Sequence, residues 1–110
     1  MRTLMKVTIP VDRGNSAIEN GSLPKTIESI LNDLKPEAAY FTTVQGQRSG
    51  LIVFDLKDTS QIPSVAEPWF LAFNAQVEFQ PVMNQEDLKR ALHGIETTVK
   101  RFRAVASRAA

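Results

Sequence analysis

Apolar and polar residues alternate at the start of the chain, which predicts a β-strand. Met5, Val7 and Ile9 fall on one side of this stretch, and Lys6 and Thr8 fall on the other. Three later stretches are short and rich in β-branched or aromatic residues, or alternate in the same way. We therefore expect four strands, at Thr3–Pro10, Ala38–Val44, Leu51–Leu56 and Val77–Pro81.

Apolar residues at intervals of three and four predict three helices. The first covers Asn15–Leu34, with a break at Asn20-Gly21. The second covers Ile62–Phe73, where Pro68 is expected to kink the helix or divide it after Ala66. The third carries one apolar stripe at spacings of four, three, four and three, formed by Leu88, Leu92, Ile95, Val99 and Phe102.

The element order β-α-β-β-α-β predicts an α+β protein with a ferredoxin-like sheet. In that topology the four antiparallel strands have the spatial order 4-1-3-2, and both crossover helices cover one face. The third helix is an addition at the C-terminal end. We expect a single domain over residues 1–103, followed by a frayed basic tail at 104–110.

The opposite face of the sheet is expected to be mixed in character. If the more apolar side of each strand faces the helices, the other side presents Lys6, Asp55 and Glu78. The second strand adds either Tyr40 with Thr42 or Phe41 with Thr43 to this face. A lysine flanked by two carboxylates is the best polar constellation in the chain, although such clusters are most often surface or interface ion pairs. The candidate ligand-binding residues are therefore Lys6, Tyr40, Asp55 and Glu78.

Composition removes several classes of chemistry. The 110 residues have a formal charge of +1 and contain no cysteine, which excludes disulfides and thiol catalysis and favours the cytoplasm. His93 is the only histidine and is expected on the solvated side of the third helix. We expect no metal, no cofactor, no nucleic-acid partner and no membrane span.

Three stretches of the chain, Leu34–Phe41, Glu67–Phe70 and Val77–Met83, resemble a family of uncharacterised bacterial domains in the dimeric α/β-barrel superfamily. The resemblance covers roughly residues 3–92 and contains no catalytic signature. It implies a homodimer in which two helix-free sheet faces meet and form a barrel. Members of this superfamily include cofactor-independent monooxygenases, haem-degrading enzymes and isomerases, so the fold alone does not assign an activity.

Two functions are consistent with the sequence. In the first, the protein is a small cytoplasmic homodimer that is non-enzymatic or regulatory, and the helix-free face is only an interface. In the alternative, that face lines a pocket for a small apolar or amphipathic molecule, as in a binding protein or a cofactor-independent enzyme. No catalytic residue can be assigned for the second function.

Overall fold

The strands form one four-stranded antiparallel sheet. A computed structural model describes the backbone of residues 1–109 and the side chains of residues 1–105. The strands are β1 (Arg2–Ile9), β2 (Ala38–Val44), β3 (Gln47–Asp55) and β4 (Gln76–Pro81). Their spatial order is β2-β3-β1-β4, which from the other edge reads β4-β1-β3-β2, so β1 lies between β3 and β4 as expected.

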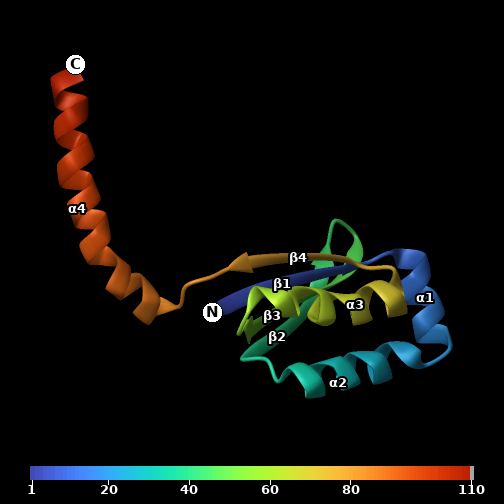
Figure 1. Cartoon of the computed structure of the whole chain (residues 1–110). Helices are drawn as coiled ribbons and strands as arrows, with labels where there is room; N and C mark the ends of the chain where they lie inside the picture. The colour runs from blue at the N-terminus through green and yellow to red at the C-terminus, as the bar shows by residue number, and fades with distance from the viewer. Residues whose placement is uncertain (110) are drawn as a thin grey trace.

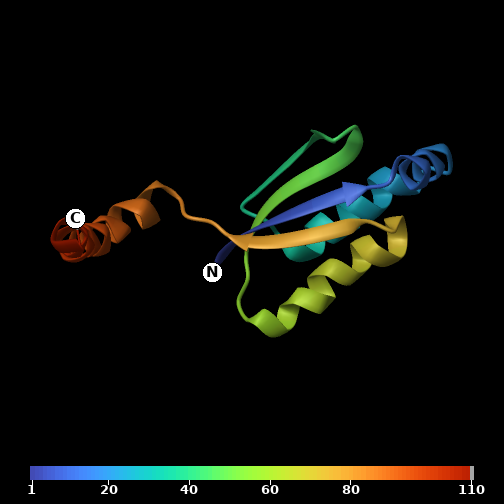
Figure 2. The ribbon, with the colours of Figure 1, turned by 90° about the horizontal axis from the view of Figure 1, so that it is seen from above.

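Three helices enclose the core on one side of this sheet, the second and third along its face and the first at the end of the sheet that follows β1 (Figures 1 and 2). They are α1 (Val11–Glu19), α2 (Ser22–Leu34) and α3 (Ile62–Phe73), and a short 3-10 turn, η1 (Thr59–Gln61), precedes α3. The predicted inward side of the strands is confirmed, because Met5, Ile52 and Phe54 are at most 2% exposed. The single tryptophan, Trp69, packs beside them and is 1% exposed.

The β2–β3 hairpin is tighter than the sequence suggested. Only Gln45 and Gly46 form the turn, with φ of 52° and 76°, and positive φ at both residues is typical of the two-residue turns that suit strand twist. The predicted loop through Gly50 is wrong, since Gly50 is part of β3. A Cβ atom there would lie 3.3 Å from the Phe41 ring, so this glycine makes room for an aromatic neighbour rather than a turn.

Two predicted helix interruptions have different outcomes. The break near Asn20-Gly21 is confirmed: Gly21 has φ of 77°, and the Asn20 side chain accepts a hydrogen bond from the Ser22 amide at 2.9 Å. The predicted division at Pro68 is wrong, because α3 continues through it. Proline removes one backbone donor, and the packing of Ala66, Trp69 and Phe73 in the core holds both sides of the helix together.

The C-terminal helix α4 (Gln85–Ala109) stands apart from the rest of the molecule. It leaves the end of the sheet where β1 begins and β4 ends, and it rises away from α2 on the side of the uncovered sheet face (Figures 1 and 2). It continues to Ala109, past residue 103 where the ordered domain was expected to end, and Ala110 lies outside the described residues. Within residues 1–109 no helix is long and apolar enough to cross a membrane.

Candidate functional site

Three of the four predicted ligand-binding residues lie in one row across the uncovered sheet face. Lys6 pairs with Leu51 on β3 and with Glu78 on β4, while Tyr40 pairs with Leu51. Paired residues of neighbouring strands point to the same face. The row therefore runs Tyr40, Leu51, Lys6, Glu78, and it selects Tyr40 with Thr42, rather than Phe41 with Thr43, for this face.

The side chains of this row have free polar groups and exposed apolar surface. Tyr40 is 67% exposed, and the described part of the chain provides no carboxylate within 4.0 Å of the Lys6 ammonium. The neighbouring row adds Leu4 and Val53, which are only partly buried. We name this surface the helix-free face, and it consists of the outward residues of the four strands: Arg2, Leu4, Lys6, Thr8, Ala38, Tyr40, Thr42, Val44, Gln47, Ser49, Leu51, Val53, Asp55, Gln76, Glu78 and Gln80.

Asp55 does not flank Lys6, so this part of the predicted constellation is wrong. Asp55 pairs with Arg2 at the far end of β3, and three residues of the strand separate it from Leu51. Its carboxylate accepts hydrogen bonds from the N-terminal ammonium at 2.6 Å and from Lys57 at 2.9 Å. These two cations lower the pKa of Asp55 to about 2, the hydrogen bond from the N-terminal ammonium being the larger cause.

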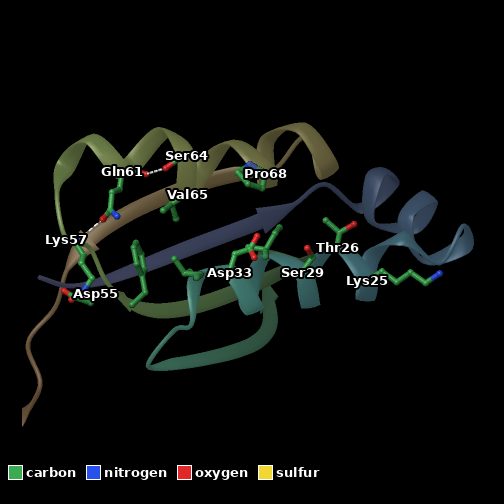
Figure 3. Close-up of a pocket in the computed structure, with 13 residues that line it drawn as sticks. Lys25, Thr26, Ser29, Asp33, Asp55, Lys57, Gln61, Ser64, Val65 and Pro68 are labelled. Carbon is green, nitrogen blue, oxygen red and sulfur yellow. Dashed lines mark hydrogen bonds and ion pairs between the residues drawn. The ribbon is translucent and has the colours of Figure 1, made fainter.

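Asp55 instead lies at one end of a cleft between α2 and α3, with a volume of about 710 Å³ (Figure 3). Thr26, Ser29 and Asp33 of α2 and Gln61 and Ser64 beside α3 provide polar groups along its walls. Gln61 is already engaged, since its side chain accepts a hydrogen bond from the Lys57 amide at 2.8 Å. The walls of the cleft combine apolar, hydroxyl and charged side chains. Within the described residues no His, Cys, Asp or Glu cluster there could hold a metal.

A second cleft, of about 640 Å³, is apolar and lies between α2 and the β2–β3 edge. Its walls include Leu23, Ile27, Phe41 and Trp69, with Arg48 among the few polar groups. Among the side chains of residues 1–105, the Trp69 Nε1 donor is the one buried polar atom without a hydrogen-bond partner. Leaving a buried donor unpaired costs about 1–3 kcal/mol, which the packing of the indole in the core offsets.

Arg2 joins three segments that are distant in sequence. Its guanidinium binds Glu37 through Nε and Nη2, at 3.0 and 2.9 Å, and binds Asp87 of α4 through Nη1 at 2.7 Å. Asp87 and Asn84 also exchange side-chain-to-backbone hydrogen bonds of 2.8 and 3.0 Å, which cap the first turn of α4. The Asn84 amide and the nearby guanidinium groups lower the pKa of Asp87.

The apolar stripe of α4 has no partner within the described residues. Leu88, Leu92, Ile95 and Val99 are 45–49% exposed, and Phe102 is 57% exposed. The helix makes its interactions with the rest of the chain near its first turn, through Arg2. Packing of an apolar face is the main source of helix stability in proteins, and the stripe on α4 is an apolar face that no described residue of the chain covers.

Two other residues considered from the sequence lie away from any cleft. His93 is exposed on α4, where the spacing placed it. Phe70 is 41% exposed, because it falls on the outer side of α3. Among the side chains of residues 1–105, none forms a hydrogen bond or an ion pair with the His93 imidazole.

Comparisons with known proteins give no family for this chain. No protein-family model matches it, and no curated protein matches its sequence.

Proposed function

We propose that this protein is a homodimer with a regulatory or scaffolding role, assembled through surfaces that a single chain leaves uncovered. The observation that carries the proposal is the exposed apolar stripe of α4. A single chain has no described element that could cover it. A second copy always carries an identical stripe, which makes self-association the simplest way to bury it.

The position of the helix-free face supports the same proposal. The helix-free face and α4 lie on the same side of the molecule, opposite α2 (Figures 1 and 2). A two-fold axis along the strand direction would bring two helix-free faces together and place both α4 helices at one end. Each chain of such a dimer has the ferredoxin-like strand order, and the two sheets together would form the barrel that the resemblance implies. Tyr40, Lys6 and Glu78 would face the interior of that barrel.

The experiment compares two substitutions on α4 by analytical ultracentrifugation at micromolar concentration. Ile95→Glu puts a charge in the middle of the stripe and is expected to convert the dimer to a monomer. Thr97→Glu puts the same charge on the outer side of the helix and is expected to leave the dimer intact. Trp69 fluorescence reports independently that the sheet core is still folded, since Trp69 is buried far from α4.

A third variant tests the contribution of the helix-free face. Tyr40→Glu adds a carboxylate on the edge strand β2 of that face and is expected to weaken the dimer without unfolding the chain, because Tyr40 is 67% exposed. A monomeric parent protein at micromolar concentration would refute the proposed function. A parent dimer that Ile95→Glu leaves unchanged would refute the role given to α4.

The apolar cleft favours a second candidate function, the binding of a small amphipathic molecule. Its apolar walls would suit an alkyl chain, and the Arg48 guanidinium would suit an anionic oxygen head group. Arg48 donates to the Asn15 side chain at 3.1 Å, and the nearest acidic residue of the cleft is the exposed Glu28. This places the pocket on the helix side of the sheet rather than on the helix-free face.

A thermal-shift titration with decanoate tests this second function. A ligand at a hundred times its dissociation constant stabilises the folded state by about 2.7 kcal/mol, which is readily measured. The shift is expected to be lost in Arg48→Met, while Arg13→Met on the nearby exposed surface is expected to retain it. Absence of any shift with decanoate, decylamine and decanol alike would remove this candidate.

A further inference from the structure

The stripe of α4 has the spacing of a helix–helix seam. Its five large apolar residues alternate at intervals of four and three, which is the a and d pattern of a heptad. Leu92 and Val99 take the a positions, and Leu88, Ile95 and Phe102 take the d positions. A strict a/d stripe is narrower than the face that a helix uses to cover a sheet, so it favours another helix as the partner.

The flanking positions of the seam differ sharply in charge. The e positions are all charged: Lys89, Glu96 and Arg103. The g positions are all uncharged: Ala91, Thr98 and Val105. Charges at these positions set the orientation of paired helices, because each lies beside the partner's flank.

Parallel and antiparallel pairing use these charges differently. In a parallel pair each e residue lies beside a g residue of the partner helix. The g residues of this helix are uncharged, so no e residue would gain a charged partner. In an antiparallel pair the e residues of both helices lie on the same flank and contact one another. Only the antiparallel arrangement gives Lys89 and Glu96 partners of opposite charge.

The charges also select one antiparallel register. When Leu92 packs against Ile95 of the partner subunit, Lys89 lies beside Glu96 of the partner subunit, and the two-fold axis repeats the pair. Four layers of large apolar residues are then buried. A shift of one heptad toward the C-terminus keeps four such layers but places Glu96 beside its own copy and Lys89 beside Arg103 of the partner subunit.

The remaining registers are poorer. A shift of one heptad the other way places two copies of Lys89 together and keeps two apolar layers. A shift of two heptads toward the C-terminus restores opposite charges, between Glu96 and Arg103, but also leaves only two layers of large apolar residues. Among these registers, the one with Leu92 against Ile95 combines four layers of large apolar residues with pairs of opposite charge at the e positions.

We infer that α4 pairs with α4 of a second copy in an antiparallel, two-fold arrangement in which Leu92 packs against Ile95 of the partner subunit. The inference rests on the proposed homodimer and specifies its geometry. It agrees with the fold, because α4 rises on the side of the helix-free face (Figures 1 and 2). In a dimer whose helix-free faces meet, the two α4 helices therefore point in opposite directions.

Pulsed electron paramagnetic resonance measures this geometry directly. The chain has no cysteine, so single cysteines for spin labels can be placed at Arg90, Thr97 and Ala104, which are exposed and share the outer f position. With a rise of 1.5 Å per residue, the inferred register separates the two labels along the axis by about 10 Å at Arg90 and Thr97 and by about 32 Å at Ala104. We expect two equal short distances and one much longer one.

Each other pattern overturns the inference in a recognisable way. Equal distances at all three positions would mean a parallel pair, and the homodimer would stand while its inferred geometry would not. The shortest distance at Thr97, with equal longer distances at Arg90 and Ala104, would mean the register shifted by one heptad. Absence of dipolar coupling at every position would contradict the proposed homodimer itself.

Charge reversal provides an independent test of the flanks. Lys89→Glu or Glu96→Lys alone is expected to weaken dimerisation by about tenfold, since two attractive pairs become repulsive, and the double variant is expected to restore it. Lys89 also lies 3.8 Å from Glu86 within its own helix, so restoration by the double variant is the decisive observation. Lys100→Glu, on the outer side of α4, is the matched control and should change the affinity little.

A membrane surface is the competing partner for a basic amphipathic helix. Co-sedimentation with phosphatidylglycerol vesicles separates the two partners. We expect the chain to remain in the supernatant as a dimer. Recovery with the vesicles, with loss of the dimer, would overturn the inferred helix pair.

Discussion

Arg2 is the residue that fixes where α4 begins relative to the sheet. It reaches Glu37 before β2 and Asp87 in the first turn of α4, and its side chain is 28% exposed. Bidentate pairing with a carboxylate sets direction as well as distance, which a lysine would not do. The orientation of α4, and with it the orientation of any helix pair, therefore depends on this one side chain.

Replacement of Arg2 by alanine is expected to loosen α4 without unfolding the domain. Amide hydrogen exchange in the first turn of α4 should become faster, while exchange in β1 and β3 should stay slow. Arg13→Ala is the matched control, because Arg13 makes only one long hydrogen bond, at 3.4 Å to the Ala72 carbonyl. Unchanged exchange at Leu88 and Lys89 in Arg2→Ala would show that the ion pairs do not anchor the helix.

Asp55 should make the stability of the fold fall at acid pH. Its folded-state pKa is lowered from 3.8 to about 2, so its stabilising contribution is complete above pH 3.8 and is lost as the pH falls toward 2. The lowered pKa of Asp87 acts in the same direction and weakens the base of α4. Thermal unfolding followed across this range is expected to show a decline that is shallower in Asp55→Asn.

Asp33→Asn is the control for the acid decline, since within the described residues Asp33 has no cation within 4.0 Å. Its profile should follow that of the parent protein. An Asp55→Asn profile as steep as the parent's would show that the N-terminal ammonium and Lys57 do not stabilise the fold through this carboxylate.

The candidate residues differ in how far sequence could place them. Alternation within β1 and β4 was enough to put Lys6 and Glu78 on one face, but the position of Asp55 along the sheet depends on pairing register, which alternation does not determine. The Arg2 cluster had no local signal. Its partners are 35 and 85 residues away, and only the folded chain brings them together.

At the scale of elements, the feature that matters most is the seam on α4. Its spacing was evident from sequence, because a helical period depends only on neighbouring residues. That it would be left uncovered was not, because exposure depends on how the segment leaves β4. Glycine is a common turn residue, but Gly50 lies within β3. Proline commonly ends a helix, but α3 continues through Pro68. At both positions tertiary packing outweighs the local preference.

Gly94 tests whether the outer side of α4 is free. It lies at position c, away from the seam, and a Cβ atom added there would meet nothing within 4 Å. Gly94→Ala is therefore expected to stabilise the helix by about 0.5–1 kcal/mol, seen as increased helicity and a raised melting temperature. Gly21→Ala is the contrasting variant, since its φ of 77° penalises alanine by about 1–2 kcal/mol. A loss of stability in Gly94→Ala would mean that this side of α4 is covered.

At the scale of the whole molecule, a single chain leaves two surfaces uncovered within its described residues. Its core is closed by α1, α2 and α3, yet two surfaces on one side, the helix-free face and the α4 seam, have no described partner in the same chain. In the proposed homodimer, a two-fold axis along the strands would cover both surfaces at once. The proposed regulatory or scaffolding role is the consequence of that assembly, and Lys6, Tyr40 and Glu78 would then line its interior.

Sedimentation equilibrium of the unmodified chain tests this account most directly. Over the micromolar range the account predicts a single species with twice the 12.2 kDa mass of one chain, and the mass should be retained when salt is raised because the seam is apolar. A mass of 12.2 kDa throughout that range would contradict it.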